Sequence, residues 1–219
     1  MKFMNSGAVN RLVAPEILDE LDPADKRAVR SRRDLRLVNW FMRGESWIVR
    51  ELKKMQGVRR VVDLGAGDGS LGAAIMEEFP DLEVTCVDLV PRPKNLEQRI
   101  TWWQGDVFDY EHYDETTVVV ANLFLHHLVS SELQKLAAKI HRVRGVLAAE
   151  PYRGQMSLMM SRCLFPFVND VTRHDMAVSI RAGFRQDELG GMLKYEPGGT
   201  LMWSDQKGVF GGIRVKGMR

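Results

Sequence analysis

Residues 61–69, with the sequence VVDLGAGDG, decide the fold that this chain predicts. An apolar run typical of a buried strand leads into a turn with glycine at alternate positions, and a helical pattern begins near Ser70. Glycine has no Cβ atom, so it permits positive φ and lets a ligand lie directly against the backbone, while the N-terminus of the following helix favours an anion. A merely structural left-handed turn needs one glycine rather than three. We therefore expect a ligand-binding loop.

Short β-rich runs alternate with helical patterns on both sides of this loop. The expected strands are residues 59–64, 82–89, 100–106, 116–123 and 143–150, with helices over 70–79 and 133–141. The run Ser130-Ser131-Glu132 predicts the N-cap of the second helix. This alternation is typical of the α/β class, and it predicts a Rossmann-like, doubly wound sheet that is mostly parallel.

The pattern changes after residue 151. Residues 155–165, 170–184 and 187–193 are helix candidates. Residues 200–203 and 208–215, joined by Ser-Asp-Gln-Lys at 204–207, predict a β-hairpin. The sheet is therefore expected to end with an antiparallel C-terminal hairpin strand.

Two amphipathic helices are expected at the N-terminus, over residues 24–36 and 35–52. The second carries Trp40, Phe41 and Trp47, a spacing that favours core packing over a substrate box. We predict an N-terminal helical cap over residues 1–57 and a ligand-binding core over residues 58–219.

The composition excludes several classes of protein. The chain has 219 residues, 45% of them hydrophobic, with Lys+Arg 31 against Asp+Glu 29 and a net charge of +2. This balance makes a nucleic acid an unlikely partner, and no apolar run is long enough for a membrane span. The N-terminus shows no signal for secretion, so we expect a cytoplasmic protein; a homodimer is compatible with the sequence. Cys86 and Cys163 lie in apolar stretches and are expected to be reduced thiols in the core.

A dinucleotide-binding loop is the first alternative. Residues 67–72 match the fingerprint G-x-G-x-x-G. Counted from Gly65, however, the sixth position is Ser70 rather than glycine. The chain also has no Tyr-x-x-x-Lys pair for hydride-transfer chemistry. An NAD(P)-dependent oxidoreductase is therefore the less favoured interpretation.

Acidic residues mark the ends of the first three expected strands. Asp88, 23 residues after Gly65, stands where a carboxylate can accept both hydroxyls of a ribose. Asp106 stands where a side-chain acceptor beside a backbone N–H could bracket an adenine edge. Asp63 precedes the glycine loop. Three acids around one glycine turn predict an adenosine pocket that needs no phosphate-binding cations.

Four segments together resemble the class I S-adenosylmethionine-dependent methyltransferases: DLGAGDGS at 63–70, CVDLVPRP at 86–93, WWQGDVFD at 102–109 and ANLFLHHL at 121–128. The order is specific, although each piece alone is not. The last segment is most similar to small-molecule methyltransferases of the ubiquinone/menaquinone and natural-product type, including enzymes encoded beside bacterial polyketide synthases. The resemblance implies S-adenosyl-L-methionine as cofactor and a role in secondary metabolism.

The resemblance also implies a set of cofactor contacts. Gly65 and Gly67 would line the methionine end, Asp63 would steady the loop, Asp88 would hold the ribose, and Asp106 with Val107 would hold the adenine. The full expected set is Asp63, Gly65, Ala66, Gly67, Asp88, Leu89, Asp106, Val107 and Asn122.

Three histidines are candidates for a general base. His126 and His127 follow the fourth expected strand, and His174 lies in the insertion before the hairpin. An imidazole near its ordinary pKa can deprotonate a phenol or an enol, but each of these histidines could equally be structural. No metal site is expected, because the histidines and acids fall on separate elements without i, i+4 spacing.

These patterns favour methyl transfer to a small, hydrophobic or aromatic acceptor, with O-methylation favoured over carbon or nitrogen. The segment Asn-Leu-Phe-Leu at 122–125 departs from the Asp/Asn-Pro-Pro-aromatic motif of amino-directed nucleic-acid methyltransferases. Two alternatives stay open. One is an RNA-directed methyltransferase guided by the basic segment at 24–36, which two acids interrupt, and the other is a non-catalytic subunit that binds the cofactor.

Overall fold

The computed structural model describes residues 10–22, 24–195 and 201–219. The described residues form a seven-stranded sheet in the order β3-β2-β1-β4-β5-β7-β6. The strands β1 to β5 are parallel, whereas β7 pairs antiparallel with β5 and β6. Their bounds are β1 Arg60–Leu64, β2 Glu83–Asp88, β3 Thr101–Gln104, β4 Thr117–Asn122, β5 Gly145–Pro151, β6 Met202–Lys207 and β7 Gly212–Met218. The predicted fold class is confirmed.

Helices cover both faces of the sheet, which explains why the central strands are apolar along their length. The α-helices are α1 Ile17–Glu20, α2 Lys26–Met42, α3 Gly44–Leu52, α4 Ser70–Glu78, α5 Ser130–Ile140, α6 Gln155–Arg162, α7 Asp170–Ala182 and α8 Glu188–Met192, and the 3-10 turns are η1 Leu125–His127 and η2 Phe165–Phe167. Side chains of α3 and α4 share one buried cluster with the sheet, and those of α5 and α8 share the other. No helix among the described residues is both long and apolar enough to cross a membrane.

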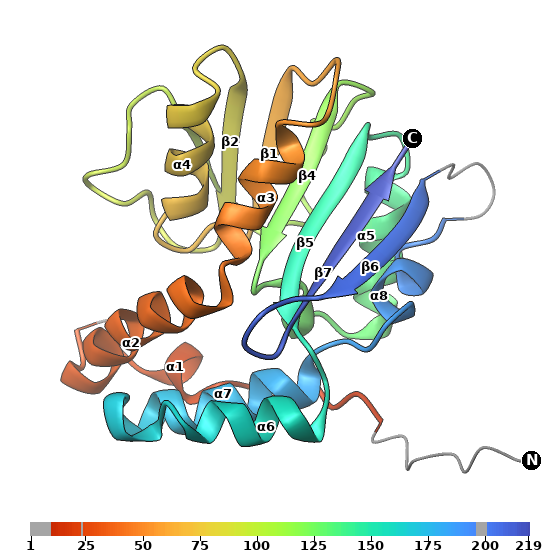
Figure 1. The fold of residues 1–219 in the computed structure, drawn as a ribbon. Coiled ribbons are helices and arrows are strands. Elements are labelled where there is room, and N and C mark those ends of the chain that lie inside the picture. The colour runs from red at the N-terminus through yellow and green to blue at the C-terminus, as the bar shows by residue number, and fades with distance from the viewer. Residues whose placement is uncertain (1–9, 23, 196–200) are drawn as a thin grey trace, which may run out of the picture.

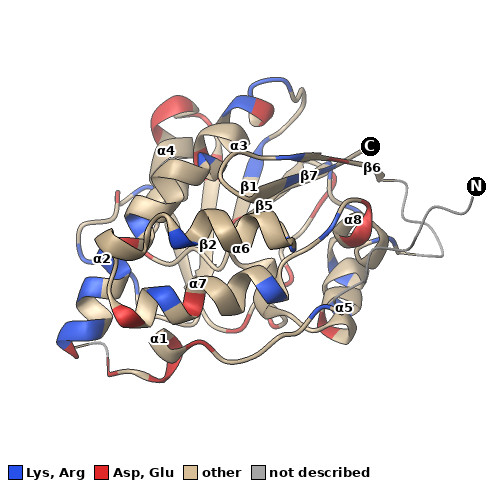
Figure 2. Cartoon of the chain, turned by 60° about the horizontal axis from the view of Figure 1, so that its bottom comes forward, with Lys and Arg blue, Asp and Glu red and all other residues tan. Residues whose placement is uncertain are grey.

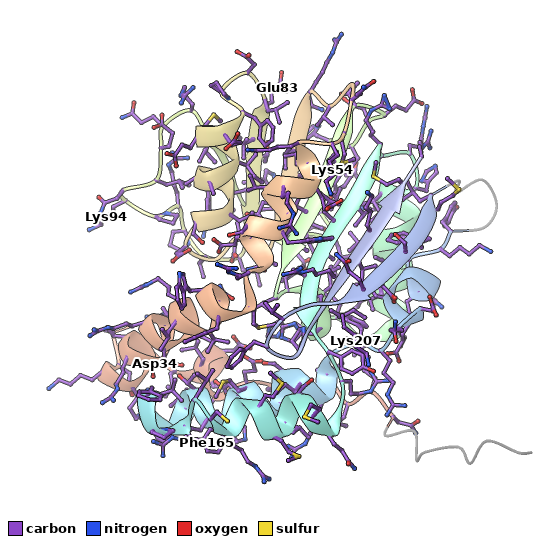
Figure 3. All side chains as sticks on the ribbon, viewed as in Figure 1. Asp34, Lys54, Glu83, Lys94, Phe165 and Lys207 are labelled. Atoms are coloured by element: carbon purple, nitrogen blue, oxygen red, sulfur yellow. The ribbon has the colours of Figure 1, made fainter. Side chains whose placement is uncertain are left out.

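The helices α1, α2, α6 and α7 gather beyond the carboxyl ends of the parallel strands (Figure 1). A polar joint holds α2 to α7: Ser31 Oγ lies 2.8 Å from Thr172 Oγ1, and the backbone N–H of Asn169 donates to Asp34 Oδ2 at 2.7 Å. Asp34 is labelled on α2 in Figure 3. The helix α3, in contrast, packs against β5 and α4 on the face of the sheet. The division into residues 1–57 and 58–219 stays a prediction.

Residues 11–20, which precede α2, pack against α7 and are here named the N-terminal strap. Arg11 holds the first part of the strap in place, because its guanidinium donates to the carbonyls of Ala182, His126 and Leu128 at 2.7–2.8 Å. Farther along, the N–H groups of Ile17 and Leu18 donate to the carboxylate of Asp175 on α7. The strap is therefore held against the end of β4 and against α7 by charged hydrogen bonds.

The C-terminal hairpin exists, but its turn was predicted in the wrong place. Residues 204–207 belong to β6, and the chain reverses at residues 208–211, where Phe210 and Gly211 have φ of 54° and 78°. Tight hairpin turns need positive φ, which glycine provides more readily than Ser-Asp-Gln-Lys. Residue 200 of the predicted first strand lies outside the described residues.

Three local expectations were also wrong. The N-cap of α5 is Val129, whose N–H donates to Glu132 at 2.8 Å, and Ser130 is already helical. Cys86 is buried in β2, but Cys163 follows the end of α6 and is exposed. Trp47 is buried, whereas Trp40 is 69% exposed, because α2 turns its Ser31, Asp34 and Val38 toward α7 rather than its tryptophan.

Candidate active site

The carboxyl ends of β1 to β4 form one edge of the sheet, and the strand order reverses between β1 and β4. Open α/β sheets bind ligands at such a switch point, because the connecting loops diverge there and leave a crevice. The glycine loop follows β1, Asp88 ends β2, Asp106 follows β3, and Asn122 ends β4. Four of the predicted contact regions thus lie along the same edge.

The three loop glycines all adopt left-handed backbone conformations. Gly65, Gly67 and Gly69 have φ of 66°, 59° and 76°. A Cβ atom on Gly65 would collide with the ring of Phe124, which therefore packs directly on the loop. A Cβ atom on Gly67 would meet nothing within 4 Å. Gly67 thus presents bare backbone to open space, as a ligand-binding position requires.

Asp63 lies beneath this loop and is almost fully buried. Its Oδ2 atom is inaccessible and has no hydrogen-bond partner among the described residues. Burial raises the pKa of Asp63 well above its ordinary value, and the negative charges of Glu45, Asp88 and Asp68 raise it further. The loop therefore carries a strongly negative electrostatic environment and one polar atom that lacks a partner.

Asp88 connects the glycine loop to the end of β2. Its Oδ2 atom accepts the N–H of Gly67 at 2.7 Å, and its Oδ1 atom accepts the N–H of Val90 at 3.0 Å. Next to it, the side chain of Leu89 is 70% exposed. A carboxylate held at the end of β2 can accept hydrogen bonds from the hydroxyls of a sugar. The exposed apolar side chain of Leu89 beside it can contact a flat ring.

Asp106 lies in the loop directly after β3 and is exposed. Its Oδ1 atom accepts the N–H of Phe108 at 2.9 Å. Val107 beside it is buried in the core cluster. The N–H of Gly105 donates to the carbonyl of Asp88 at 2.9 Å, so the ends of β2 and β3 are held together.

Asn122 lines a narrow hollow of about 10 Å³ at the end of β4, room for about one water molecule. The next residue, Leu123, has a positive φ of 56°, which is unusual for a residue with a branched side chain and is a form of strain often found at functional sites. Other residues of the hollow come from α2, α3, β5 and the hairpin, and they include Met42, Gly44, Glu150 and Arg214.

His126 lies on η1 and is only 2% exposed. Its Nδ1 atom is 2.7 Å from Glu150 Oε2, and its Nε2 atom is 3.8 Å from Glu16 Oε1 on the N-terminal strap. Burial opposes the charge of this imidazole, but the hydrogen bonds to Glu150 and Glu16 outweigh it and raise the pKa of His126 to about 9. His126 is therefore a positioned cation between two carboxylates.

His127 stacks beside His126, with ring centroids 4.2 Å apart. Burial and the charge of His126 lower the pKa of His127, so its neutral form is favoured. His174 differs from both: it stands on α7 with its side chain 51% exposed, and its Nδ1 atom lies 3.0 Å from Asp175 Oδ1. The structure thus brings together two of the three predicted histidines and holds the third in a separate pair with Asp175.

Two carboxylates of this region were missed in the sequence. Glu150 ends β5, and its carboxylate accepts the N–H groups of Phe124, Leu125 and His126. An acid at the end of the apolar run 143–150 was a usable signal. Glu16 had none, because only the folded strap brings it to His126.

Comparison with known proteins identifies the central segment. Residues 61–144 match a family model described as a methyltransferase domain. The chain is 32% identical over 94 residues to pluviatolide O-methyltransferase of Sinopodophyllum hexandrum, a match that covers 42% of the chain and 25% of that enzyme. The chain therefore spans about a quarter of the length of this relative.

Solved structures share the fold at low sequence identity. The plantazolicin methyltransferase BpumL, crystallised with a triazolic desmethylPZN analogue and SAH, superposes with a TM-score of 0.68 at 14% identity, covering 90% of this chain and 91% of BpumL. The S-adenosylmethionine-dependent methyltransferase SibL in its apo form gives a TM-score of 0.63 at 16% identity, covering 94% of this chain and 63% of SibL.

The resemblance predicted from the sequence motifs is confirmed by the family model and by the shared fold. Residues 61–144 therefore resemble a methyltransferase domain, and the chain shares the fold of the solved methyltransferases BpumL and SibL.

Proposed function

We propose that this protein transfers a methyl group from S-adenosyl-L-methionine to a small, hydrophobic or aromatic acceptor, with oxygen as the favoured acceptor atom. The observation that carries the proposal is the ring of acids around the open glycine loop. The charges of Glu45, Asp68 and Asp88 all act on Asp63 beneath the loop. Gly67 in the same loop offers bare backbone.

The charge of the loop separates two cofactors that use similar turns. A dinucleotide brings a pyrophosphate with two negative charges, which four carboxylates would repel. S-adenosylmethionine brings a sulfonium and an ammonium group, which the same carboxylates attract. Arg36, 4.0 Å from Asp68, is a basic side chain at this rim, and its side chain is largely exposed. The acidic loop therefore favours the methyl donor over NAD(P).

The residues predicted from the sequence fit this cofactor. We propose that the unpartnered oxygen of Asp63 and the backbone of Gly65, Ala66 and Gly67 receive the aminoacyl end. Asp88 would bind the ribose, with Leu89, Asp106 and Val107 around the adenine and Asn122 beside the transferred methyl group. When bound, the cofactor supplies a methyl group already activated on sulfur, so the protein's main task is to align the acceptor and exclude water.

We also propose that one of three histidines, His126, His127 or His174, removes the proton from the acceptor. The environment of His126 keeps it protonated, and His174 is half-exposed on α7 and paired with Asp175. His127 is the neutral imidazole of the adjacent pair, which makes it the best suited of the three to accept a proton. A cytoplasmic location, a homodimer and a small-molecule rather than a peptide acceptor are likewise proposed from the sequence.

Calorimetry with S-adenosylhomocysteine tests the cofactor assignment. We expect Asp88→Asn to weaken binding by about 1.5–3 kcal/mol, because hydrogen bonds from the ribose to a charged carboxylate are lost. The exposed Asp81 is the matched control, and Asp81→Asn should bind as the wild type does. S-adenosylhomocysteine should also raise the melting temperature, whereas NADH should not. Unchanged affinity in Asp88→Asn, or stabilisation by NADH alone, would reject the assignment.

A further inference from the structure

Three metal-ligating side chains meet at the end of β4, although Glu16 and His126 are 110 positions apart in the sequence. Glu16, His126 and His127 each offer one ligand atom, and these atoms all lie within 4.8 Å of one another. We propose that this cluster is a binding site for one divalent transition-metal ion of the zinc type.

His126 is oriented as a ligand requires. Its Nδ1 atom is hydrogen-bonded to Glu150, which leaves Nε2 directed toward Glu16. In the metal-free protein Nε2 carries a proton, which the metal ion would displace to solvent on binding. Metal-bound histidines commonly donate their second ring N–H to a carboxylate, which fixes the tautomer and strengthens the ligand. Glu150 is itself held by backbone N–H groups of η1, which keeps its carboxylate in place beside the ring of His126.

Glu16 is equally well positioned. It is buried, and its Oε1 atom accepts a hydrogen bond from Ser179 on α7. The next two residues of the strap, Ile17 and Leu18, are bound through their N–H groups to Asp175. Zinc–ligand bonds of about 2.0–2.2 Å need ligand atoms about 3.5 Å apart, so the separations of up to 4.8 Å can close by small side-chain rotations.

The surrounding charges favour a cation. Three carboxylates face the two imidazoles: Glu150 from β5, and Glu16 and Asp19 from the strap. Arg11 is the nearby basic side chain, but its guanidinium is already bound to backbone carbonyls. A divalent ion would balance the remaining negative charge.

The ligand types select the kind of ion. Magnesium and calcium prefer sets of oxygen ligands, whereas two imidazoles and one carboxylate suit zinc and its neighbours in the first transition row. With three protein ligands, a fourth position is left for water or another group. A neutral imidazole has one ring nitrogen with an available lone pair, which can either bind a metal ion or accept a proton. A bound ion would therefore prevent His127 from acting as a base.

Zinc binding to the full chain tests the site. After treatment with a chelator and its removal, we expect titration calorimetry to give one Zn²⁺ per chain and the melting temperature to rise with Zn²⁺. Glu16→Gln, which keeps the hydrogen bond to Ser179, and His127→Asn should each weaken binding at least tenfold. Glu20→Gln on the same strap and His112→Asn are matched exposed controls, and both should bind Zn²⁺ as tightly as the wild type.

A second measurement does not depend on the folding of variants. Co²⁺ added to the metal-free wild type should give the visible absorption of a four-coordinate centre, and one equivalent of Zn²⁺ should abolish it. Circular dichroism checks that each variant is folded. The proposal is wrong if the wild type takes up no Zn²⁺, if Glu16→Gln binds it unchanged, or if Co²⁺ keeps the spectrum of the hydrated ion. In each case the cluster is an ion pair only.

Discussion

At the scale of single residues, Asp63 shows that a group suited to ligand binding can lower the stability of the ligand-free protein. One oxygen of its buried carboxylate has no hydrogen-bond partner in the described part of the chain, and three other acids act on it electrostatically. A buried polar group left unsatisfied costs about 1–3 kcal/mol. Such a cost is expected where the structure holds a group in readiness for a ligand.

We therefore expect Asp63→Asn to stabilise the cofactor-free protein by about 1 kcal/mol and to weaken binding of S-adenosylhomocysteine at least tenfold. The amide has the size of the carboxyl group but carries no charge to desolvate. Urea unfolding and calorimetry measure the two effects, with Asp81→Asn as the surface control. A variant that is less stable and binds as tightly as the wild type would contradict this role of Asp63.

The stability gained by Asp63→Asn should increase with pH. The pKa of Asp63 is raised in the folded state above its ordinary value of 3.8, so the folded state retains the proton to higher pH than the unfolded state does. Its contribution to stability therefore falls as pH rises above 3.8 and stays constant once the folded-state pKa is passed. The advantage of Asp63→Asn should be smaller at pH 4 than at pH 8, measured as the difference in urea midpoint. An equal difference at both pH values would contradict the shift.

At the scale of elements, the N-terminal strap depends on one arginine. Arg11 donates to four carbonyl groups from two segments, and its guanidinium carbon lies 4.5 Å above the ring of Phe184. Burial lowers the pKa of Arg11, but arginine stays charged at neutral pH. The strap has little apolar surface of its own at α1, where no residue is buried.

Arg11→Met keeps much of the side-chain volume and removes the charged hydrogen bonds. We expect a loss of about 2–3 kcal/mol in the free energy of unfolding and faster proteolytic cleavage within residues 11–20. Lys26→Met, at an exposed basic position of α2, is the control and should change neither quantity. Unchanged cleavage in Arg11→Met would mean that the bonds from Ile17 and Leu18 to Asp175 are sufficient to hold the strap.

The elements also show what the sequence could predict. The central strands were found because burial on both faces leaves continuous apolar runs, such as residues 117–121, and the glycine loop was found because its backbone geometry demands glycine. The turn at 208–211 was missed because Phe210 carries one of the positive φ angles, and no residue preference predicts that. Glu16 and His126 are 110 positions apart in the sequence and meet only in the folded chain. The hydrophobic periodicity of a sequence predicts local helices and strands but not such a distant contact.

At the scale of the whole molecule, the distribution of charge bears on RNA as an alternative acceptor. Basic residues lie along α2, and acidic residues lie near them in the fold (Figure 2). Arg27 is paired with Asp25 at 3.1 Å, and the net charge of the chain is only +2. Binding to RNA rests on neutralising many phosphates and falls steeply with salt, whereas a small neutral acceptor releases few ions.

We therefore expect binding of S-adenosylhomocysteine and methyl transfer to a phenolic acceptor to change less than twofold between about 50 and 200 mM salt, a range over which a protein with many phosphate contacts loses about a thousandfold in affinity. A fluorescent single-stranded RNA should show no saturable binding at the higher concentration. Reversing two exposed charges, Arg30→Glu and Arg33→Glu, removes much of the basic face without touching the cofactor loop. Activity that survives this double variant supports a small acceptor. Activity that is lost while S-adenosylhomocysteine still binds would identify the basic face of α2 as part of the acceptor site and favour a polyanionic acceptor.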